Sequence, residues 1–198
     1  MATGIGVGIA GDTFQEKAGV GMGPDAFSNL YSVLFDGVDE YLESSSLAPD
    51  FGTGNWSINF WIYRTSTGGA QRILSKSGGS DKNGASPNAK SVSAISGSFG
   101  GGSGTIFRFG RNEASSYNFA GNLDEISVWS KALSALEVAA LYNSGKPTDL
   151  TSESGLINWF RMGDPEGPSV YPTITDSVGG INMTMTNMSS VNITTNVP

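Results

Sequence analysis

The side chains in this sequence that could perform chemistry are carboxylates, and two of them, Asp124 and Glu125, are adjacent. Glycoside hydrolysis needs two carboxyl groups about 5 to 9 Å apart across the scissile bond. Neighbouring side chains of a β-strand point to opposite faces, so we expect Asp124 and Glu125 not to act as a pair. The chain also has no histidine and no cysteine, which removes the usual general base and thiolate nucleophile. We therefore predict no enzymatic activity.

Calcium is considered because many members of the family that the chain resembles, described at the end of this subsection, bind it through aspartate and asparagine oxygens. The candidate ligands are Asp36, Asp39 and Asp124. Asp36 has a simpler interpretation, since it precedes Gly37 in a pattern typical of a tight turn. Calcium needs six or more oxygens, and without the middle hairpin of that family a complete set cannot be assembled. No cofactor or metal site is therefore predicted, and calcium stays an open alternative.

Aromatic residues in the segment from Trp56 to Tyr63 are candidates for binding. Alternation predicts a strand with one apolar face, consisting of Trp56, Ile58, Phe60 and Ile62. Trp61 and Tyr63 then lie on the opposite face and need cover. A helix or loop of the chain, another subunit, or a glycan could provide it, and residues 76–104 would contribute to a glycan site.

A short helix is expected after a strand over Leu123–Trp129. Ser134 and Glu137 form a capping box, and Gly145 is expected to end the helix. A helix of about ten residues is marginal alone, so it must pack on something larger. The residues expected to make that contact are Leu136, Ala140 and Leu141.

The composition predicts an all-β protein: 28 of 198 residues are glycine and only 15% are charged. Tyr31–Phe35 and Val38–Glu43 are expected to form a hairpin around Asp36-Gly37. Further strands are predicted at 72–75, 105–109, 155–162 and 181–188. The expected fold is one antiparallel β-sandwich with a short helix.

Residues 1–29 are rich in glycine and are predicted either to be a disordered tail or to be an attachment arm. An arm would use Ile5, Val7, Ile9 and Phe14, whose spacing suits addition to a neighbouring sheet edge. The net charge of −7 argues against nucleic acid as a partner. No apolar run approaches the roughly 20 residues of a membrane span, and no basic segment suggests a signal peptide.

Three segments carry a resemblance to a known family. They are Leu34–Leu42 (LFDGVDEYL), Trp56–Ile62 (WSINFWI) and Gly121–Tyr142 (GNLDEISVWSKALSALEVAALY). Together they resemble LamG-like domains of the concanavalin A-like lectin/glucanase superfamily, over roughly Ser32 to Tyr142. The resemblance implies a jelly-roll sandwich. The chain departs from the family between 76 and 104, where neither the W-x-hydrophobic strand nor the Y-V-D-G hairpin is found, and it lacks the glucanase E-x-D-x-x-E motif.

Residues 143–150, 159–164, 168–172 and 185–188 resemble the C-terminal extension of LamG-like structural proteins of tailed phages, especially marine ones. This resemblance implies an arm (1–29) followed by a sandwich with a C-terminal extension (30–198). It further implies a virion structural protein, a capsid decoration or appendage subunit on the virion surface. Its partners would be the major capsid protein, other virion proteins and copies of itself. The alternative is a carbohydrate-binding module that recognises a host surface glycan through Trp61 and Tyr63.

Overall fold

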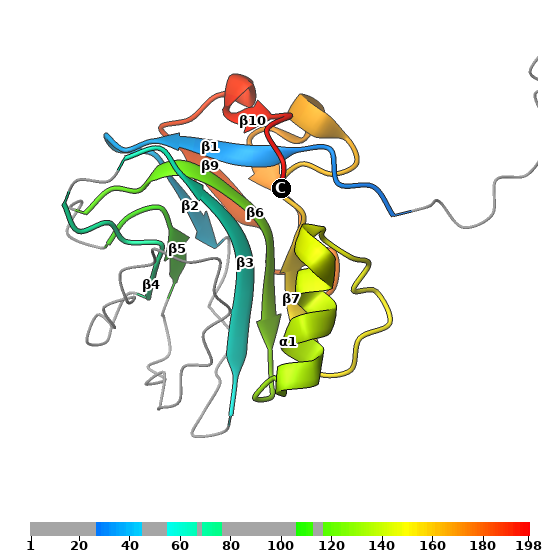
Figure 1. Ribbon diagram of the computed structural model, residues 1–198. Coiled ribbons are helices and arrows are strands. Elements are labelled where there is room, and N and C mark those ends of the chain that lie inside the picture. The colour runs from blue at the N-terminus through cyan, green and yellow to red at the C-terminus, as the bar shows by residue number, and fades with distance from the viewer. Residues whose placement is uncertain (1–26, 45–54, 67–68, 77–105, 113–116) are drawn as a thin grey trace, which may run out of the picture.

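Two antiparallel sheets of five strands each pack face to face in the computed structural model (Figure 1). The structure describes residues 27–44, 55–66, 69–76, 106–112 and 117–198. Within these residues there is one α-helix, which lies outside the sandwich, and no helix is long and apolar enough to cross a membrane. The predicted all-β sandwich is therefore confirmed, whereas its jelly-roll order stays a prediction.

The first sheet is built around its long central strand, β6. Its strands are β1 (Ser32–Asp36), β3 (Ser57–Arg64), β6 (Ala120–Trp129), β7 (Leu156–Phe160) and β10 (Ile193–Thr194). β3 pairs along nearly the whole of β6. On the other edge, β1 pairs with residues 120–123 and β7 with residues 126–129. The two ends of the described chain thus meet in one sheet, since β10 pairs with β1.

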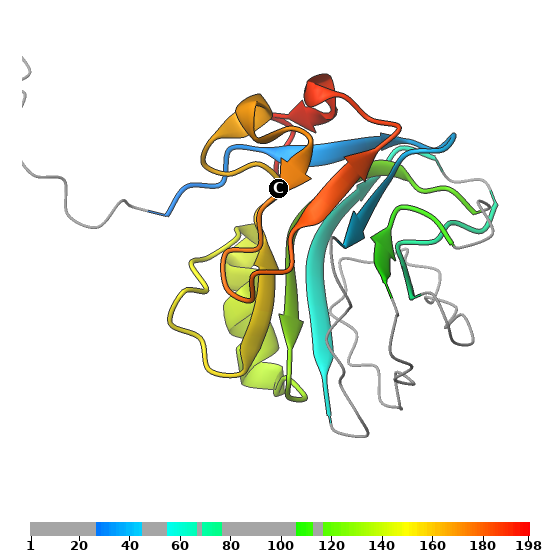
Figure 2. The same ribbon diagram turned by 180° about the vertical axis from the view of Figure 1, so that it is seen from behind.

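The second sheet consists of shorter strands and faces the core from the opposite side (Figure 2). These are β2 (Tyr41–Ser44), β4 (Leu74–Lys76), β5 (Phe107–Phe109), β8 (Thr173–Ile174) and β9 (Met183–Thr186). The predicted hairpin is wrong, because β1 and β2 belong to different sheets. The Asp36-Gly37 turn exists, with Gly37 at φ 82°, but it carries the chain from one sheet to the other.

The main core lies between the sheets and is apolar. The alternation seen in the sequence holds here: Phe107 and Phe109 of β5, like Met183 and Met185 of β9, point inward and are buried. Trp159 and Phe160 of β7 point to opposite sides, and Phe160 joins this core. Burial of these side chains is the main source of stability of the sandwich.

A β-bulge interrupts β6 and changes which side chains share a face. Asn59 pairs with Ser127 but Trp61 pairs with Asp124, so β6 carries one more residue than β3 between these pairs. Glu125 sits in the bulge with φ 45°. An extra residue in a strand shifts the alternation of its side chains. The prediction that Asp124 and Glu125 point to opposite faces is therefore wrong, as their partners described below also require.

The helix α1 (Ala135–Tyr142) begins as its sequence predicts. Both hydrogen bonds of the capping box between Ser134 and Glu137 are present. The helix ends earlier than expected, because Asn143 adopts the left-handed conformation at φ 39° and serves as the C-cap. A short 3-10 turn, η1 (Asn143–Gly145), follows, and two more are η2 (Gly167–Val170) and η3 (Ser190–Asn192).

Only one of the three expected helix contacts is made. Leu141 is buried against the outer side of the first sheet, where it forms a second apolar cluster with Trp129, Leu150 and Trp159. Leu136 is 84% exposed and Ala140 is also exposed, so the prediction for these two residues is wrong. Within α1, Leu141 is the one buried residue, so Leu136 and Ala140 lie outside the narrow face that meets the sheet.

Candidate functional site

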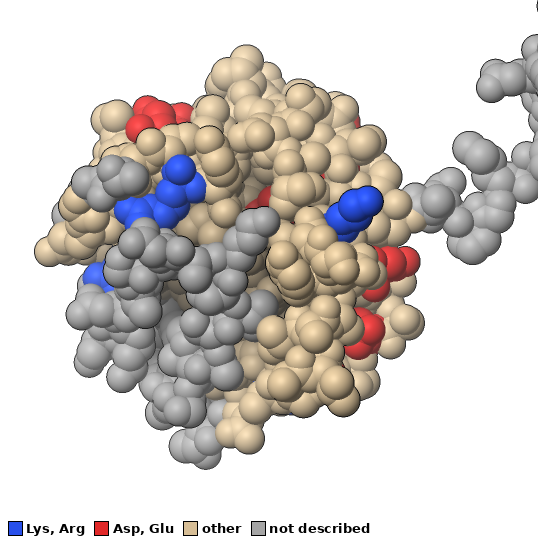
Figure 3. All heavy atoms as spheres, in the orientation of Figure 1, with Lys and Arg blue, Asp and Glu red and all other residues tan. Residues whose placement is uncertain are grey.

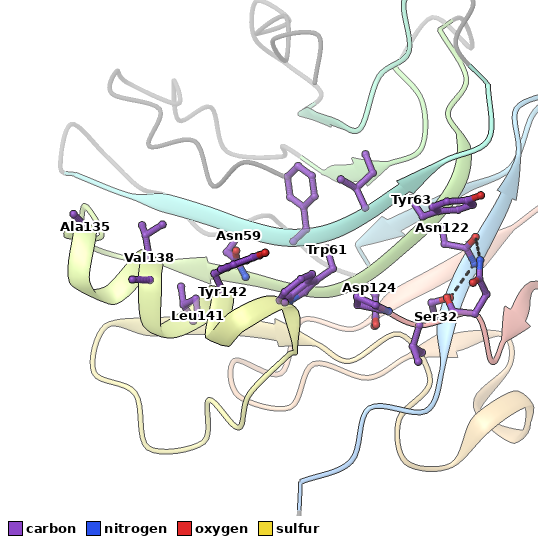
Figure 4. Close-up of a pocket in the computed structure, with 17 residues that line it drawn as sticks. Ser32, Asn59, Trp61, Tyr63, Asn122, Asp124, Ala135, Val138, Leu141 and Tyr142 are labelled. Atoms are coloured by element: carbon purple, nitrogen blue, oxygen red, sulfur yellow. Dashed lines mark hydrogen bonds between the residues drawn. The ribbon is translucent and has the colours of Figure 1, made fainter. Parts of the chain in front are cut away.

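A groove of about 440 Å³ runs between the outer side of the first sheet and helix α1 (Figure 4). β3 and β6 form its floor, α1 forms one wall, and residues 196–198 close one end. The volume lies within the range of about 300–1,000 Å³ that is usual for small-molecule sites. The groove is lined mainly by apolar and aromatic side chains, with a few polar groups among them.

The aromatic residues predicted as a binding surface lie in this groove. Trp61 is half-buried and stacks on Tyr142 of α1, with ring centroids 6.0 Å apart and planes 20° apart. Tyr63, two residues further along β3, is 60% exposed at the rim. The helix thus covers Trp61 in part, and a surface of three aromatic rings remains along the groove.

Asn59 precedes these aromatic residues on the same face of β3. Its side chain is 6% exposed and lines the groove beside Tyr142 (Figure 4). In the described part of the chain its amide group makes no side-chain hydrogen bond. Asn59 therefore has a donor and an acceptor available to a molecule in the groove.

Asn122 uses its side chain for hydrogen bonds within the chain at one end of the groove, and not towards the groove itself. Its amide nitrogen donates to the hydroxyl oxygens of Ser32 (2.9 Å) and Thr194 (3.1 Å). Its amide oxygen accepts from the side chain of Asn196 at 3.0 Å. This network holds the last residues of the chain against the sheet, so the closed end of the groove is a fixed wall.

The two adjacent carboxylates of β6 lie on the outer side of the sheet, and each is 2% exposed. Asp124 lines the floor of the groove and accepts hydrogen bonds from the Asn29 side chain (3.0 Å) and the Glu125 backbone (2.8 Å). Glu125 accepts from the indole of Trp159 and from Arg161, the latter at 3.3 Å. All four carboxylate oxygens are thus occupied by groups of the chain itself.

Burial perturbs the acid–base properties of both carboxylates. It raises the pKa of Asp124 well above its ordinary value, and the neighbouring charge of Glu125 adds to this effect. Burial also raises the pKa of Glu125 to about 7, although Arg161 and the Trp159 hydrogen bond oppose the rise. These two groups therefore retain protons to a higher pH than exposed carboxylates.

The carboxylates belong to a cluster that holds the start of the described chain. We call Asp124, Glu125, Arg161 and Asp164 the clamp, and residues 27–31 the root. Asp164, 8% exposed, accepts hydrogen bonds from the backbone of Leu30 (3.0 Å and 3.1 Å) and Tyr31 (3.3 Å).

Arg161 joins the clamp to the first residues of the root. Its guanidinium donates to the carbonyl oxygen of Ser28 and lies 4.7 Å from the ring centroid of Phe27. Phe27 in turn stacks on Trp159, with centroids 6.2 Å apart. Backbone, aromatic ring and side chain of the root are therefore all held by buried or half-buried residues of β6, β7 and the segment that follows.

The calcium candidates are not brought together. Asp36 accepts from the Val38 backbone at 2.7 Å in the turn after β1, and Asp39 accepts from Asn187 at 3.0 Å. Asp124 is committed to the clamp. Among the described residues no three acidic, histidine or cysteine side chains are grouped to hold a metal ion. Ile5, Val7, Ile9 and Phe14 of the predicted arm, and the loop 77–105, lie outside the described residues.

Some of the residues that build these sites were missed from the sequence. Asn59 could have been found, because it occupies the same face of β3 as Trp61. Tyr142 and Asp164 gave no such signal, since helix packing and a contact across more than 130 positions place them. No family model matches the chain, and neither a curated protein nor a solved structure is significantly similar to it.

Proposed function

We propose that this chain is a non-enzymatic structural protein of a virus particle, a decoration or appendage subunit on the surface of a tailed phage. In this proposal the N-terminal arm attaches the sandwich to the major capsid protein or to other virion proteins, and copies associate as a homo-oligomer. The observation that carries the proposal is the clamp, which fixes the point where the arm leaves the sandwich.

The clamp is expected to contribute little to the net stability of the fold, because buried charges lose their hydration. What it does provide is a defined geometry. Two consecutive backbone N–H groups, of Leu30 and Tyr31, and one carbonyl, of Ser28, are each bound by a charged side chain. A root held in this way is a fixed point on the sandwich to which the arm is joined, as an attachment needs.

The clamp also argues against catalysis by its carboxylates. Asp124 and Glu125 lie on the same side of β6, so strand alternation does not keep their carboxyl groups apart. Their oxygens, however, are all engaged by donors of the chain, and each side chain is 2% exposed. A catalytic pair must reach its substrate, and these groups instead serve the root.

The proposal is tested by measuring copy number in purified particles by quantitative mass spectrometry. We expect tens to hundreds of copies per particle, as for a lattice-bound decoration protein; a few copies would indicate a tail or fibre appendage. Deletion of residues 1–26 should abolish incorporation while leaving the thermal unfolding midpoint of the free domain unchanged. Absence of the protein from particles would refute the proposal.

A second variant tests the role of the clamp in attachment. Asp164→Asn removes the charge that binds the Leu30 and Tyr31 backbone and should lower occupancy on particles without abolishing it. Asp36→Asn is a matched control, because Asp36 is exposed, accepts a hydrogen bond from Val38 in its own turn and is not part of the clamp. Equal occupancy of both variants would contradict a special role for the root.

A further inference from the structure

The outer edge of β3 is a part of the first sheet that the described chain does not use. β3 is the last strand on its side of β6, and no described residue pairs with its other edge. Every second residue of an edge strand directs its backbone N–H and C=O groups away from the sheet, where they can pair with another strand. Proteins commonly protect such an edge with lysine, proline or short length. β3 has eight residues without lysine or proline, and its one charged residue is Arg64 at its end, so its edge is open to an added strand.

Apolar side chains beside this edge are incompletely covered on both faces of the sheet. On the inner face, Phe60 and Ile62 are half-buried at the border of the main core. On the outer face, Trp61 is half-buried and Tyr63 is 60% exposed (Figure 4). Ile58, earlier on the same strand, is buried. A strand added at this edge would therefore bury apolar surface on both faces, in addition to pairing backbone groups.

Residues 4–9 of the arm, GIGVGI, have a pattern that matches both faces of this edge. Side chains of a strand alternate, so Ile5, Val7 and Ile9 would lie on one face and the three glycines on the other. The aliphatic side chains would extend the main core beside the half-buried residues of the inner face. The glycines would then lie beside the aromatic rings of the outer face, an arrangement in which a ring covers the backbone that glycine leaves bare.

The distribution of charge favours contact between copies at this place. Each copy has a net charge of −7, so copies repel one another unless they meet at uncharged surface. The described part of the face that carries β3 and α1 shows few charged side chains (Figure 3), and the arm has none before Asp12. Arg64 has a buried Nε that makes no hydrogen bond to any described residue. An arm running parallel to β3 would bring Asp12 to that end of the strand, where its carboxylate can pair with Arg64.

We propose that residues 4–9 of one copy pair with the outer edge of β3 in a second copy, as an added strand parallel to it. This inference rests on the proposed function, in which copies associate, and names the surface through which they do so. Residues 10–26 join the added strand to the root and span up to roughly 55 Å when extended, which is enough to reach a neighbouring copy.

The position of the root favours a second copy over the same chain. The root is held on the side of β6 that carries β1 and β7, whereas β3 lies on the other side (Figure 1). The donating arm and the accepting edge are thus different surfaces at opposite sides of one sheet. Contacts between two different surfaces are heterologous and generate a closed ring or a chain of copies.

The first test measures association of the purified full-length chain by sedimentation equilibrium over a range of concentrations. The wild type should associate. Val7→Pro removes a backbone N–H from the added strand, and Tyr63→Lys places a charge at the accepting edge, so each should raise the dissociation constant at least about tenfold. Ala18→Pro, elsewhere in the arm, and Leu136→Lys, at an 84% exposed position of α1, are matched controls that should leave association unchanged. Thermal unfolding checks that every variant is folded.

The second test exchanges the charges that set the direction of the added strand. Asp12→Arg and Arg64→Asp should each weaken association several-fold, because like charges then meet. An equimolar mixture of the two variants should associate more strongly than either alone, because the arm of one then meets an opposite charge on the other. Pairing of the arm with its own chain cannot produce this rescue.

Several results would overturn the inference. These are a monomeric wild type at millimolar concentration, full association of Val7→Pro or Tyr63→Lys, and no rescue in the mixture. Loss of association in Leu136→Lys would assign the contact to α1 instead. Many copies in particles together with a monomeric purified chain would refute this inference and leave the virion proposal intact. An arm-linked oligomer that is absent from particles would refute the virion proposal alone.

Discussion

The two sides of strand β6 are both buried, yet they are built in different ways. On the inner side, Leu123, Ile126 and Val128 belong to the apolar core between the sheets. On the outer side, Asp124 and Glu125 hold the root, and Asp124 also lines the groove. The inner side needs only shape and hydrophobicity, whereas the outer side depends on the hydrogen bonds of buried carboxylates. Buried residues on the inner side therefore stabilise the sandwich, whereas buried residues on the outer side hold the root in place.

The largest expected effect is on the inner side. Ile126→Ala removes a side chain that is 0% exposed and should lower the free energy of unfolding by about 2–5 kcal/mol, through lost burial and a residual cavity. Leu136→Ala, at an 84% exposed position of α1, should change it by less than about 0.5 kcal/mol. Urea denaturation at constant pH measures both, and equal losses would break the distinction between core and helix surface.

A pH-dependent effect is expected on the outer side. The pKa of Glu125 rises from 4.5 to about 7 on folding, so between these values the folded state binds more protons than the unfolded state. The contribution of Glu125 therefore makes stability fall as pH rises from about 4.5 to 7, by about 3 kcal/mol at most, since one pKa unit corresponds to about 1.4 kcal/mol.

The difference between wild type and Glu125→Gln measures this contribution together with the change in Asp124, whose pKa the charge of Glu125 helps to raise. Glutamine cannot ionise, so the variant should lose that part of the fall in stability, while Ile126→Ala should retain it. Urea denaturation across the pH range measures the three proteins in parallel. A pH profile of Glu125→Gln that runs parallel to the wild type would contradict the assignment.

The smallest expected effect concerns the helix that forms a wall of the groove. Ser134→Ala removes the capping side chain and should cost about 1 kcal/mol of stability. Ser152→Ala changes an exposed serine outside the helix and serves as the control. Thermal unfolding gives the cost. If both substitutions are equally neutral, the cap does not stabilise the position of α1 on the outer side.

The sequence alone determined the elements whose signals are local. The capping box at Ser134, the strand over Trp56–Tyr63 and the inward methionines of β9 depend on neighbours within a few positions, so their patterns can be read directly. The all-β sandwich follows from the same patterns. Trp61 and Tyr63 were also correctly assigned to the face opposite the core, because strand alternation fixes it.

Tertiary structure alone decided how these elements are combined. The bulge at Glu125 shifts the alternation of β6, and it is defined by the pairing with β3, in which Asn59 faces Ser127 and Trp61 faces Asp124. The hairpin was wrong because β1 found partners in β6 and β10, far away in the chain. Asp164 binds the root across 134 positions. Such contacts join residues that are far apart in the sequence, so patterns within a few positions do not predict them.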